Sequence, residues 1–252
     1  MKKKYLLLFL LLGITLFSEA ATRGDVKVIE SSEDIRYLSQ KIVKDYLFLY
    51  NHPQKIEVKD ALYISLSKLS DDLRVIVTTT KDVDTKDILE FLAYSQDQIK
   101  SLVDEEVDKE KAALMLDYSE TLLEGADSIA SSHTYDFSEE ERMLMVTKEI
   151  EYLLERITKY YMAFNVKFNT HTNRMQMDES IANLEKNLEK IDLYIYPNDL
   201  EEEKEKLKKY WQINKHFFQK TESLFIPNLV LPSIDKLEDI IAKIALYHSK
   251  NQ

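Results

Sequence analysis

The sequence contains no cysteine, and its 252 residues include only 3 glycines and 4 prolines. Without cysteine the chain cannot form a disulfide, bind an iron–sulfur cluster or attach a c-type haem. Scarce glycine leaves few positions for tight hairpins or phosphate-cradling loops, because such turns need backbone conformations that favour glycine. We therefore expect a predominantly helical protein that is stabilised by a packed core and needs no cofactor.

Basic residues are also too few to balance the acidic ones. There are 45 Asp and Glu against 34 Lys and Arg, and the formal net charge is −11. A protein of this sign is repelled by the phosphate backbone of nucleic acids and by anionic lipid headgroups. The composition therefore argues against nucleic acid as a partner and against binding to an anionic membrane surface.

The first twenty residues have the pattern of a bacterial signal peptide. Lys2 to Lys4 precede the short apolar run Tyr5 to Phe17, and a small-x-small cleavage pattern follows at Ser18 to Ala20. The run is too short to cross a bilayer comfortably, since a membrane helix needs about 20 residues. We expect cleavage after residue 20, a periplasmic mature protein and no membrane span after cleavage. An uncleaved N-terminal anchor is the alternative.

Two segments resemble each other at a spacing of 115 residues. Residues 36–49 read RYLSQKIVKDYLFL, and residues 151–164 read EYLLERITKYYMAF. Apolar residues three or four positions apart continue the match downstream, as on one face of a helix. The third segments match only after a shift of about four positions, which pairs Ile88, Leu92 and Ile99 with Leu207, Trp211 and Phe218. The sequence predicts one helical module used twice, with a small insertion in one copy; a chance match of helical heptads is the alternative.

Turn-forming and capping residues divide each half of the chain into four helical segments. Ser138 followed by Glu141 predicts a capping box at the start of the second half. Four amphipathic helices with short connections pack most simply as an antiparallel bundle. We expect an all-α protein of two tandem antiparallel four-helix bundles, residues 21–134 and 135–252, after the signal peptide of residues 1–20. The predicted breaks lie at residues 52–53, 78–84, 131–138, 169–173, 196–199 and 226–232.

The first helix of the first bundle carries the most specific motif. Residues 36–46 read RYLSQKIVKDY, which resembles the R-M-L-S-Q-R/K-I/M-x-K-x-Y/L signature of the periplasmic sensor domain of type IV pilus methyl-accepting chemotaxis transducers (PilJ/NarX-like). That domain is related to the input domain of nitrate/nitrite sensor kinases. The resemblance implies a four-helix bundle that binds a small anion at a homodimer interface. By matching positions it implies Arg36, Ser39, Gln40 and Lys41 as ligand contacts.

The residues before this motif depart from the family pattern. The family has a glycine there, whereas residues 30–35 read ESSEDI. Carboxylates at Glu33 and Asp34 are expected to attract the Arg36 guanidinium and to oppose an incoming anion. Ion pairs along the helix or at the surface are therefore the alternative function of Arg36 and Lys41.

In the second half the motif is incomplete. The 115-residue register puts Arg156 opposite Lys41, whereas another register puts Arg142 on the signature arginine. Neither register restores the full motif. Arg142 and Arg156 are the candidates for a second ligand site, and we expect this copy to be degenerate.

Other chemistry finds little support. The Met-x-Met pairs Met143/Met145 and Met175/Met177 carry thioethers that select Cu(I), but residues i and i+2 of a helix point in different directions, which favours core packing. The five histidines show no i, i+4 pair and are expected at the surface or in loops. No nucleophile motif is present. We predict no metal site and no enzymatic activity.

Two function classes remain. The first is a sensor module that binds a small molecule and passes the signal to a separate periplasmic or inner-membrane protein, since no cytoplasmic output region is recognisable. The second is a non-catalytic interaction or structural protein without a small ligand. A pocket beside Arg36 would favour the first, and an exposed apolar stripe would favour the second.

Overall fold

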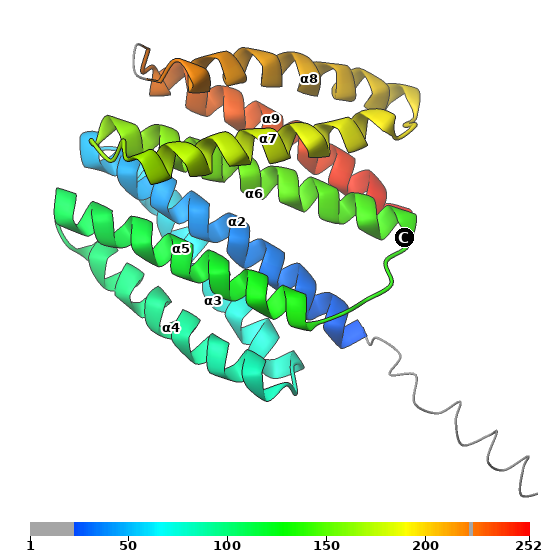
Figure 1. Ribbon diagram of the computed structural model, residues 1–252, viewed down its shortest axis with the longest axis horizontal. Coiled ribbons are helices and arrows are strands. Elements are labelled where there is room, and N and C mark those ends of the chain that lie inside the picture. The colour runs from blue at the N-terminus through cyan, green and yellow to red at the C-terminus, as the bar shows by residue number, and fades with distance from the viewer. Residues whose placement is uncertain (1–22, 222–223) are drawn as a thin grey trace, which may run out of the picture.

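The computed structural model describes residues 23–221 and 224–252, and within those ranges every regular element is an α-helix (Figure 1). The all-α prediction is therefore confirmed for this part of the chain. The predicted signal peptide lies outside the described residues. The helices are α2 (Arg23–Asn51), α3 (Ile56–Thr79), α4 (Val83–Asp104), α5 (Lys109–Ser132), α6 (Glu139–Asn165), α7 (His171–Leu193), α8 (Asn198–Gln219) and α9 (Pro227–Lys250).

The helices form two groups that meet along α2 and α6 (Figure 1). In the first group, α2 packs against α3 and α5, and α4 packs against the same two helices. In the second group, α6 packs against α7 and α9, while α8 contacts α7 and α9 from the other side. Because α2 and α6 also pack against each other, these two helices lie at the centre of the molecule.

The burial pattern repeats at a spacing of 115 residues, and α4 and α8 show this most clearly. Both ends of α8 lie 115 residues after the ends of α4. The predicted insertion is therefore wrong. Two buried positions of α8 carry the polar residues Lys204 and Asn214. An alignment of the two halves that matches only apolar residues therefore shifts α8 by about one helical turn. The matching buried pairs are Leu89 with Lys204, Leu92 with Leu207, Gln96 with Trp211, Ile99 with Asn214 and Val103 with Phe218.

The helix boundaries follow the predicted breaks with two exceptions. The connection between α4 and α5 at residues 105–108 was not predicted, because it contains neither glycine nor proline. Ser138 Oγ accepts the Glu141 N–H at 3.2 Å, and Glu141 Oε2 accepts the Ser138 N–H at 2.7 Å, which confirms the capping box. The predicted break at 226–232 is too long, because Pro227 is the first residue of α9 and Pro232 lies inside that helix. Proline suits the first turn, where the backbone N–H has no partner within the helix.

Helices α4 and α5 approach each other closely at Gly125. A Cβ at this position would lie 2.4 Å from Cδ2 of Leu92, which is fully buried. Glycine inside a helix costs about 1 kcal/mol relative to alanine. The close packing explains why α5 nevertheless carries glycine here.

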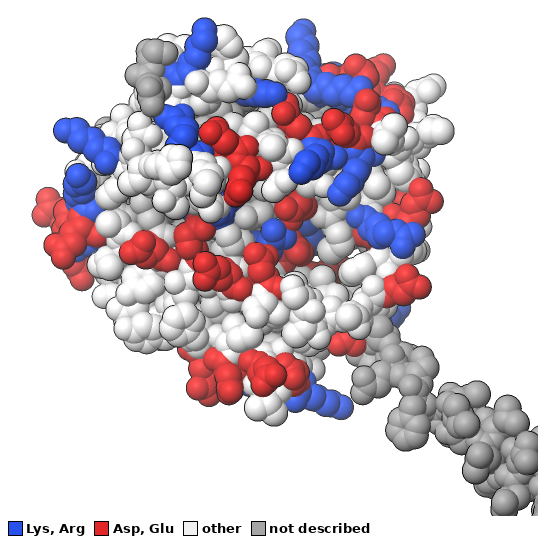
Figure 2. Space-filling view, viewed as in Figure 1, with Lys and Arg blue, Asp and Glu red and all other residues white. Residues whose placement is uncertain are grey.

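Charged side chains are spread over the face of the molecule shown in Figure 2. In this view basic groups are concentrated towards α7 and α8, and acidic groups predominate towards α3 and α4. None of the helices in the described ranges combines the length and the apolar character that crossing a membrane requires.

Candidate functional site

Charged side chains are buried where α2 meets α6. Glu155 of α6 is fully buried, and its Oε1 accepts hydrogen bonds from Lys44 Nζ at 2.8 Å and from Lys41 Nζ at 2.9 Å. Burial alone would raise the pKa of Glu155, but Lys44 and Lys41 outweigh it and lower the pKa below its ordinary value. Glu155 is therefore an ionised carboxylate that serves as the counter-ion of two lysines.

A second carboxyl group completes this cluster from α9. Burial raises the pKa of Glu238 well above its ordinary value, and the negative charge of Glu155 raises it further. Glu155 Oε2 and Glu238 Oε1 are both buried without a hydrogen-bond partner in the described part of the chain. The opposite directions of the two pKa shifts place the negative charge on Glu155 and the proton on Glu238.

Helix α6 carries the corresponding basic pair 115 residues later, at Arg156 and Lys159. Arg156 Nη2 donates to Glu120 Oε2 at 2.9 Å and to Gln176 Oε1 at 2.6 Å. Lys159 is fully buried and donates to Glu120 Oε1 at 2.5 Å and to Ser119 Oγ at 3.1 Å. Burial lowers the pKa of Lys159 to about 8, although Glu120 opposes the shift. Each basic pair thus binds a carboxylate from the other half of the chain.

Arg36, the central residue of the predicted anion site, is surrounded by carboxylates. Its Nη1 lies 2.6 Å from both Glu33 Oε2 and Glu149 Oε2, and its Nε lies 2.8 Å from Asp127 Oδ1. The guanidinium carbon lies 4.2 Å from the centroid of the Tyr152 ring. Burial would lower the pKa of Arg36, but the carboxylates raise it above its ordinary value. The attraction predicted between Glu33 and Arg36 is confirmed.

The other predicted contacts of the motif point to different surroundings. Ser39 and Gln40 are fully buried. Ser39 Oγ donates to the backbone oxygen of Arg36 at 2.7 Å, and Gln40 Nε2 donates to Ser39 Oγ at 2.9 Å. Lys41 lines an open cleft, although its ammonium group is bonded to Glu155. The four motif residues therefore do not converge on one ligand position.

The two candidates of the second half lie apart from each other. Arg142 is exposed near the start of α6, and its Nη1 donates to the backbone oxygen of Phe137 at 2.6 Å. Arg156 is buried in the ion-pair cluster with Glu120. The two arginines lie 14 positions apart on α6 (156 − 142), which is about 21 Å along the helix axis, and the structure does not bring them together.

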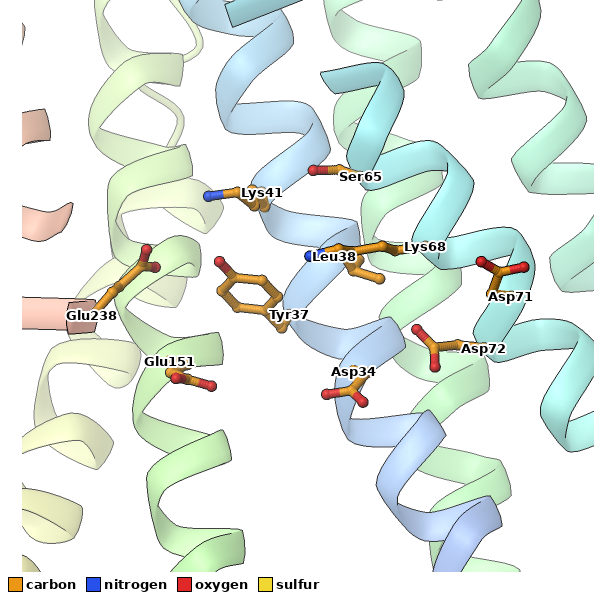
Figure 3. Close-up of a pocket in the computed structure, with 10 residues that line it drawn as sticks. All are labelled: Asp34, Tyr37, Leu38, Lys41, Ser65, Lys68, Asp71, Asp72, Glu151 and Glu238. Atoms are coloured by element: carbon orange, nitrogen blue, oxygen red, sulfur yellow. The ribbon is translucent and has the colours of Figure 1, made fainter. Parts of the chain in front are cut away.

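An open cleft of about 460 Å³ lies beside α2 (Figure 3). Its walls come from α2 and α3 of the first half and from α6 and α9 of the second half. Five carboxyl groups and two ammonium groups line it, which makes the cleft acidic. The lining residues are Asp34, Tyr37, Leu38, Lys41, Ser65, Lys68, Asp71, Asp72, Glu151 and Glu238. The motif pointed to this helix but not to the carboxylates that dominate the cleft.

Two carboxyl groups of the cleft titrate near neutral pH. Burial raises the pKa of Glu151 to about 7, with Lys148 opposing and Asp34 adding to the shift. Burial also raises the pKa of Asp72 to about 7, again with a contribution from Asp34. Glu151 forms no hydrogen bond or ion pair with any other residue that the structure describes. When both groups are ionised, the carboxylates of the cleft outnumber its ammonium groups, and the resulting negative potential favours a positively charged guest.

His248 contradicts the expectation that all histidines lie at the surface or in loops. It is fully buried on α9. Its Nδ1 lies 2.5 Å from Glu140 Oε2, and its Nε2 lies 2.9 Å from the hydroxyl of Tyr196. Tyr194 donates to the other oxygen of Glu140 at 2.5 Å. This chain of polar groups ties α9 to the start of α6 and to the connection before α8. Sequence spacing gave no sign of it, because the partners are far apart along the chain.

Comparison of the chain with protein-family models, with curated proteins and with solved structures finds no match. Across residues 23–221 and 224–252, no three histidine or acidic side chains are grouped so that they would hold a metal ion. The geometry of the cleft and of the α2–α6 contact is therefore the basis for a functional proposal.

Proposed function

We propose that the protein is a periplasmic ligand-binding module of two four-helix bundles, which binds a small molecule in the acidic cleft and signals to a separate membrane partner. The observation that carries the proposal is the position of the cleft, which α2 and α3 share with α6 and α9. A ligand that contacts helices from both halves favours one relative placement of the halves over others. Such differential affinity is what a ligand needs in order to shift a conformational equilibrium.

The sequence motif supports a ligand on this side of α2. Tyr37, Leu38 and Lys41 belong to the motif that resembles the transducer sensor domains, and all three line the cleft. Arg36 already has three carboxylate partners. We therefore place the ligand in the cleft rather than on Arg36. The basic residues, apolar run and small-x-small pattern at the start of the sequence support export to the periplasm.

The proposal is tested by thermal unfolding of the purified protein against a panel of small molecules. The panel contains nitrate, nitrite, other small anions, carboxylates, primary amines and guanidines. A ligand at 100 times its dissociation constant stabilises the folded state by about 2.7 kcal/mol. For a chain of this size that corresponds to a rise in the midpoint of roughly 5–10 °C.

Three variants locate the site. Tyr37→Ala removes an aromatic wall of the cleft, and the matched variant Tyr94→Ala removes a tyrosine that is 57% exposed on α4. We expect a saturable rise in the midpoint that Tyr37→Ala abolishes and Tyr94→Ala preserves. Loss of the rise only in Arg36→Ala would place the ligand on the predicted anion site instead. No rise with any compound would overturn the proposal.

One observation favours the second function class, a module that binds a partner chain without a small ligand. Leu193, the last residue of α7, and Ile195, in the connection to α8, are 83% and 87% exposed. Exposed apolar side chains close together are typical of interaction sites. Co-purification from the periplasm with the wild type and with the double variant Leu193→Ser/Ile195→Ser tests this function. A protein retained by the wild type and lost by the variant would support it, and equal retention would contradict it.

A further inference from the structure

The acidic cleft has a counterpart in the second half, at a spacing of 115 residues. Asp34 and Tyr37 of the cleft correspond to Glu149 and Tyr152, and their surroundings are buried in the same pattern. Both positions therefore combine a carboxylate and a tyrosine ring on the first helix of their half. Because α2 packs against α6, each of these two positions faces the first helix of the other half.

In the second half this position is already occupied by a cation of the protein itself. The Arg36 guanidinium lies over the Tyr152 ring, with its carbon 4.2 Å from the ring centroid, and its Nη1 lies 2.6 Å from Glu149. Glu33 and Asp127 add two further carboxylates around it. A tyrosine face and carboxylates are the groups that recognise a guanidinium or an ammonium ion.

In the first half the residue that corresponds to Arg36 is Glu151. The charge at this position is reversed and the side chain is shorter, so no counterpart of the Arg36 guanidinium lies over Tyr37. Lys41 Nζ lies 5.5 Å from the centroid of the Tyr37 ring, but it corresponds to Arg156, which lies 6.0 Å from the centroid of Tyr152, and not to Arg36. The open cleft adjoins this ring (Figure 3). Glu151 has no ion-pair partner among the described residues. Lys148 binds only Oδ1 of Asp34, at 2.5 Å, and leaves the second oxygen of that carboxylate without a partner in the described part of the chain.

Building on the proposed function, we propose that the cleft binds a small organic cation, a primary amine or a guanidine, with its charged group over Tyr37 between Asp34 and Glu151. The ligand takes the position that Arg36 occupies in the second half. Farther along the cleft, Asp71 and Asp72 of α3 lie on the other side of Leu38 (Figure 3). Lys68 of α3 also extends into this part of the cleft (Figure 3). The volume of about 460 Å³ is in the usual range for small-molecule sites.

Isothermal titration calorimetry of the purified protein with agmatine and with putrescine tests this ligand class. Butyramide, a neutral amide, and sodium nitrate, an anion, are the comparison compounds. We expect saturable binding of at least one of the two cations with one site per chain, and no binding of butyramide or nitrate. This pattern follows because a carboxylate-lined site stabilises positive charge and repels anions.

The decisive variant is Glu151→Arg, which supplies the first half with the guanidinium that the second half already has. We expect it to fold with an unchanged or higher unfolding midpoint and to bind the cations at least about tenfold more weakly, because its own side chain occupies the site. Glu179→Arg makes the same charge change at an exposed position of α7, and it should bind as the wild type does.

The outcomes separate the ligand class from the proposed function. Cation binding that Glu151→Arg leaves unchanged would overturn the assigned position. Binding of nitrate or butyramide that Tyr37→Ala abolishes, without binding of either cation, would overturn the ligand class while keeping a ligand site in the cleft. Absence of binding for every compound, together with a flat response in the unfolding panel, would contradict both.

Discussion

Replacement of Glu155 by glutamine should reveal how much the buried charge cluster contributes to stability. Lys44 Nζ and Lys41 Nζ lie 2.8 and 2.9 Å from Glu155 Oε1, and the carboxylate has no exposure to solvent. The variant keeps an acceptor oxygen but leaves two lysines without their shared counter-ion. Removing one partner of a buried pair costs about 3–5 kcal/mol. We expect the lower end of that range, because Asp45 lies 3.5 Å from Lys44 and Glu238 can ionise.

Urea unfolding and thermal unfolding followed by circular dichroism measure this loss. A destabilisation of about 3 kcal/mol should lower the thermal midpoint by roughly 6–12 °C for a chain of this size. The matched control is Glu185→Gln, which breaks a partly exposed ion pair with Lys215 at 2.6 Å. Because exposed pairs contribute about 1 kcal/mol or less, the control should change the midpoint by only a few degrees.

A double-mutant cycle with Lys44→Met separates the ion pair from other effects of the substitution. The double variant should lose less stability than the sum of the two single variants, because the fully buried Lys44 ammonium is gone and only Lys41 remains beside the neutral amide. Additive losses would refute the assignment of Glu155 as the counter-ion of Lys44. A loss below about 1 kcal/mol for Glu155→Gln alone would refute the estimate of the cluster's strength.

The pH dependence of the same variant has a defined sign. The lysines hold the pKa of Glu155 in the folded protein below its unfolded value. Its contribution is therefore fully present above the unfolded pKa, which is about 4.3 for glutamate, and is lost as the pH falls through the folded value. The stability difference between wild type and Glu155→Gln should be constant near neutral pH and shrink in acid.

Three further predictions concern other parts of the molecule. Gly125→Ala should lower the free energy of unfolding by about 1–2 kcal/mol, because the new Cβ crowds Leu92, even though alanine favours a helix more than glycine does. The loss should be smaller in a Leu92→Ala background, and equal losses in urea unfolding would contradict this. Glu151→Gln should stabilise the protein by about 1–3 kcal/mol at pH 8 and not at pH 4. The pKa of Glu151 rises from about 4.3 in the unfolded chain to about 7 in the folded protein, so the wild type loses stability as the pH rises between these two values. His248→Ala should cost about 1–3 kcal/mol, since it leaves the hydroxyl of the buried Tyr196 without its partner and removes the bond to Glu140, whereas His216→Ala, at an exposed position of α8, should cost less than 1 kcal/mol; similar losses would refute a structural role for the buried histidine.

The fold class and most helix boundaries could be predicted from sequence because they depend on local properties. Scarce glycine, apolar periodicity and the Ser138 capping box act within a few residues of each other. The register of the repeat in α4 and α8 could not be predicted from apolar residues alone. Lys204 occupies a buried position there by donating to backbone oxygens of Asp192 and Tyr194 at 3.1 and 3.2 Å. Because these partners lie at the end of another helix, the sequence around Lys204 gives no sign that it is buried.

At the candidate site, too, contacts within one helix could be predicted from the sequence, whereas contacts between helices could not. The pairing of Arg36 with Glu33 was predictable because the residues are one helical turn apart. Its other carboxylate partners, Glu149 and Asp127, come from α6 and α5 and depend on the packing of helices. One sequence feature did carry information about the cleft: the tyrosine is kept between the two copies, whereas the charge of its neighbour changes from Arg36 to Glu151.

The central position of α2 and α6 has a consequence for how the chain folds. Every residue from 42 to 49 and from 152 to 163 is buried, so these helices present no solvent-facing side over more than two turns. One hydrophobic core continues through both halves. A half expressed by itself would expose one of these helices together with its charged groups, so neither half is complete as a folding unit. Although the sequence repeat divides the chain into two halves, we expect both halves to unfold together in a single transition.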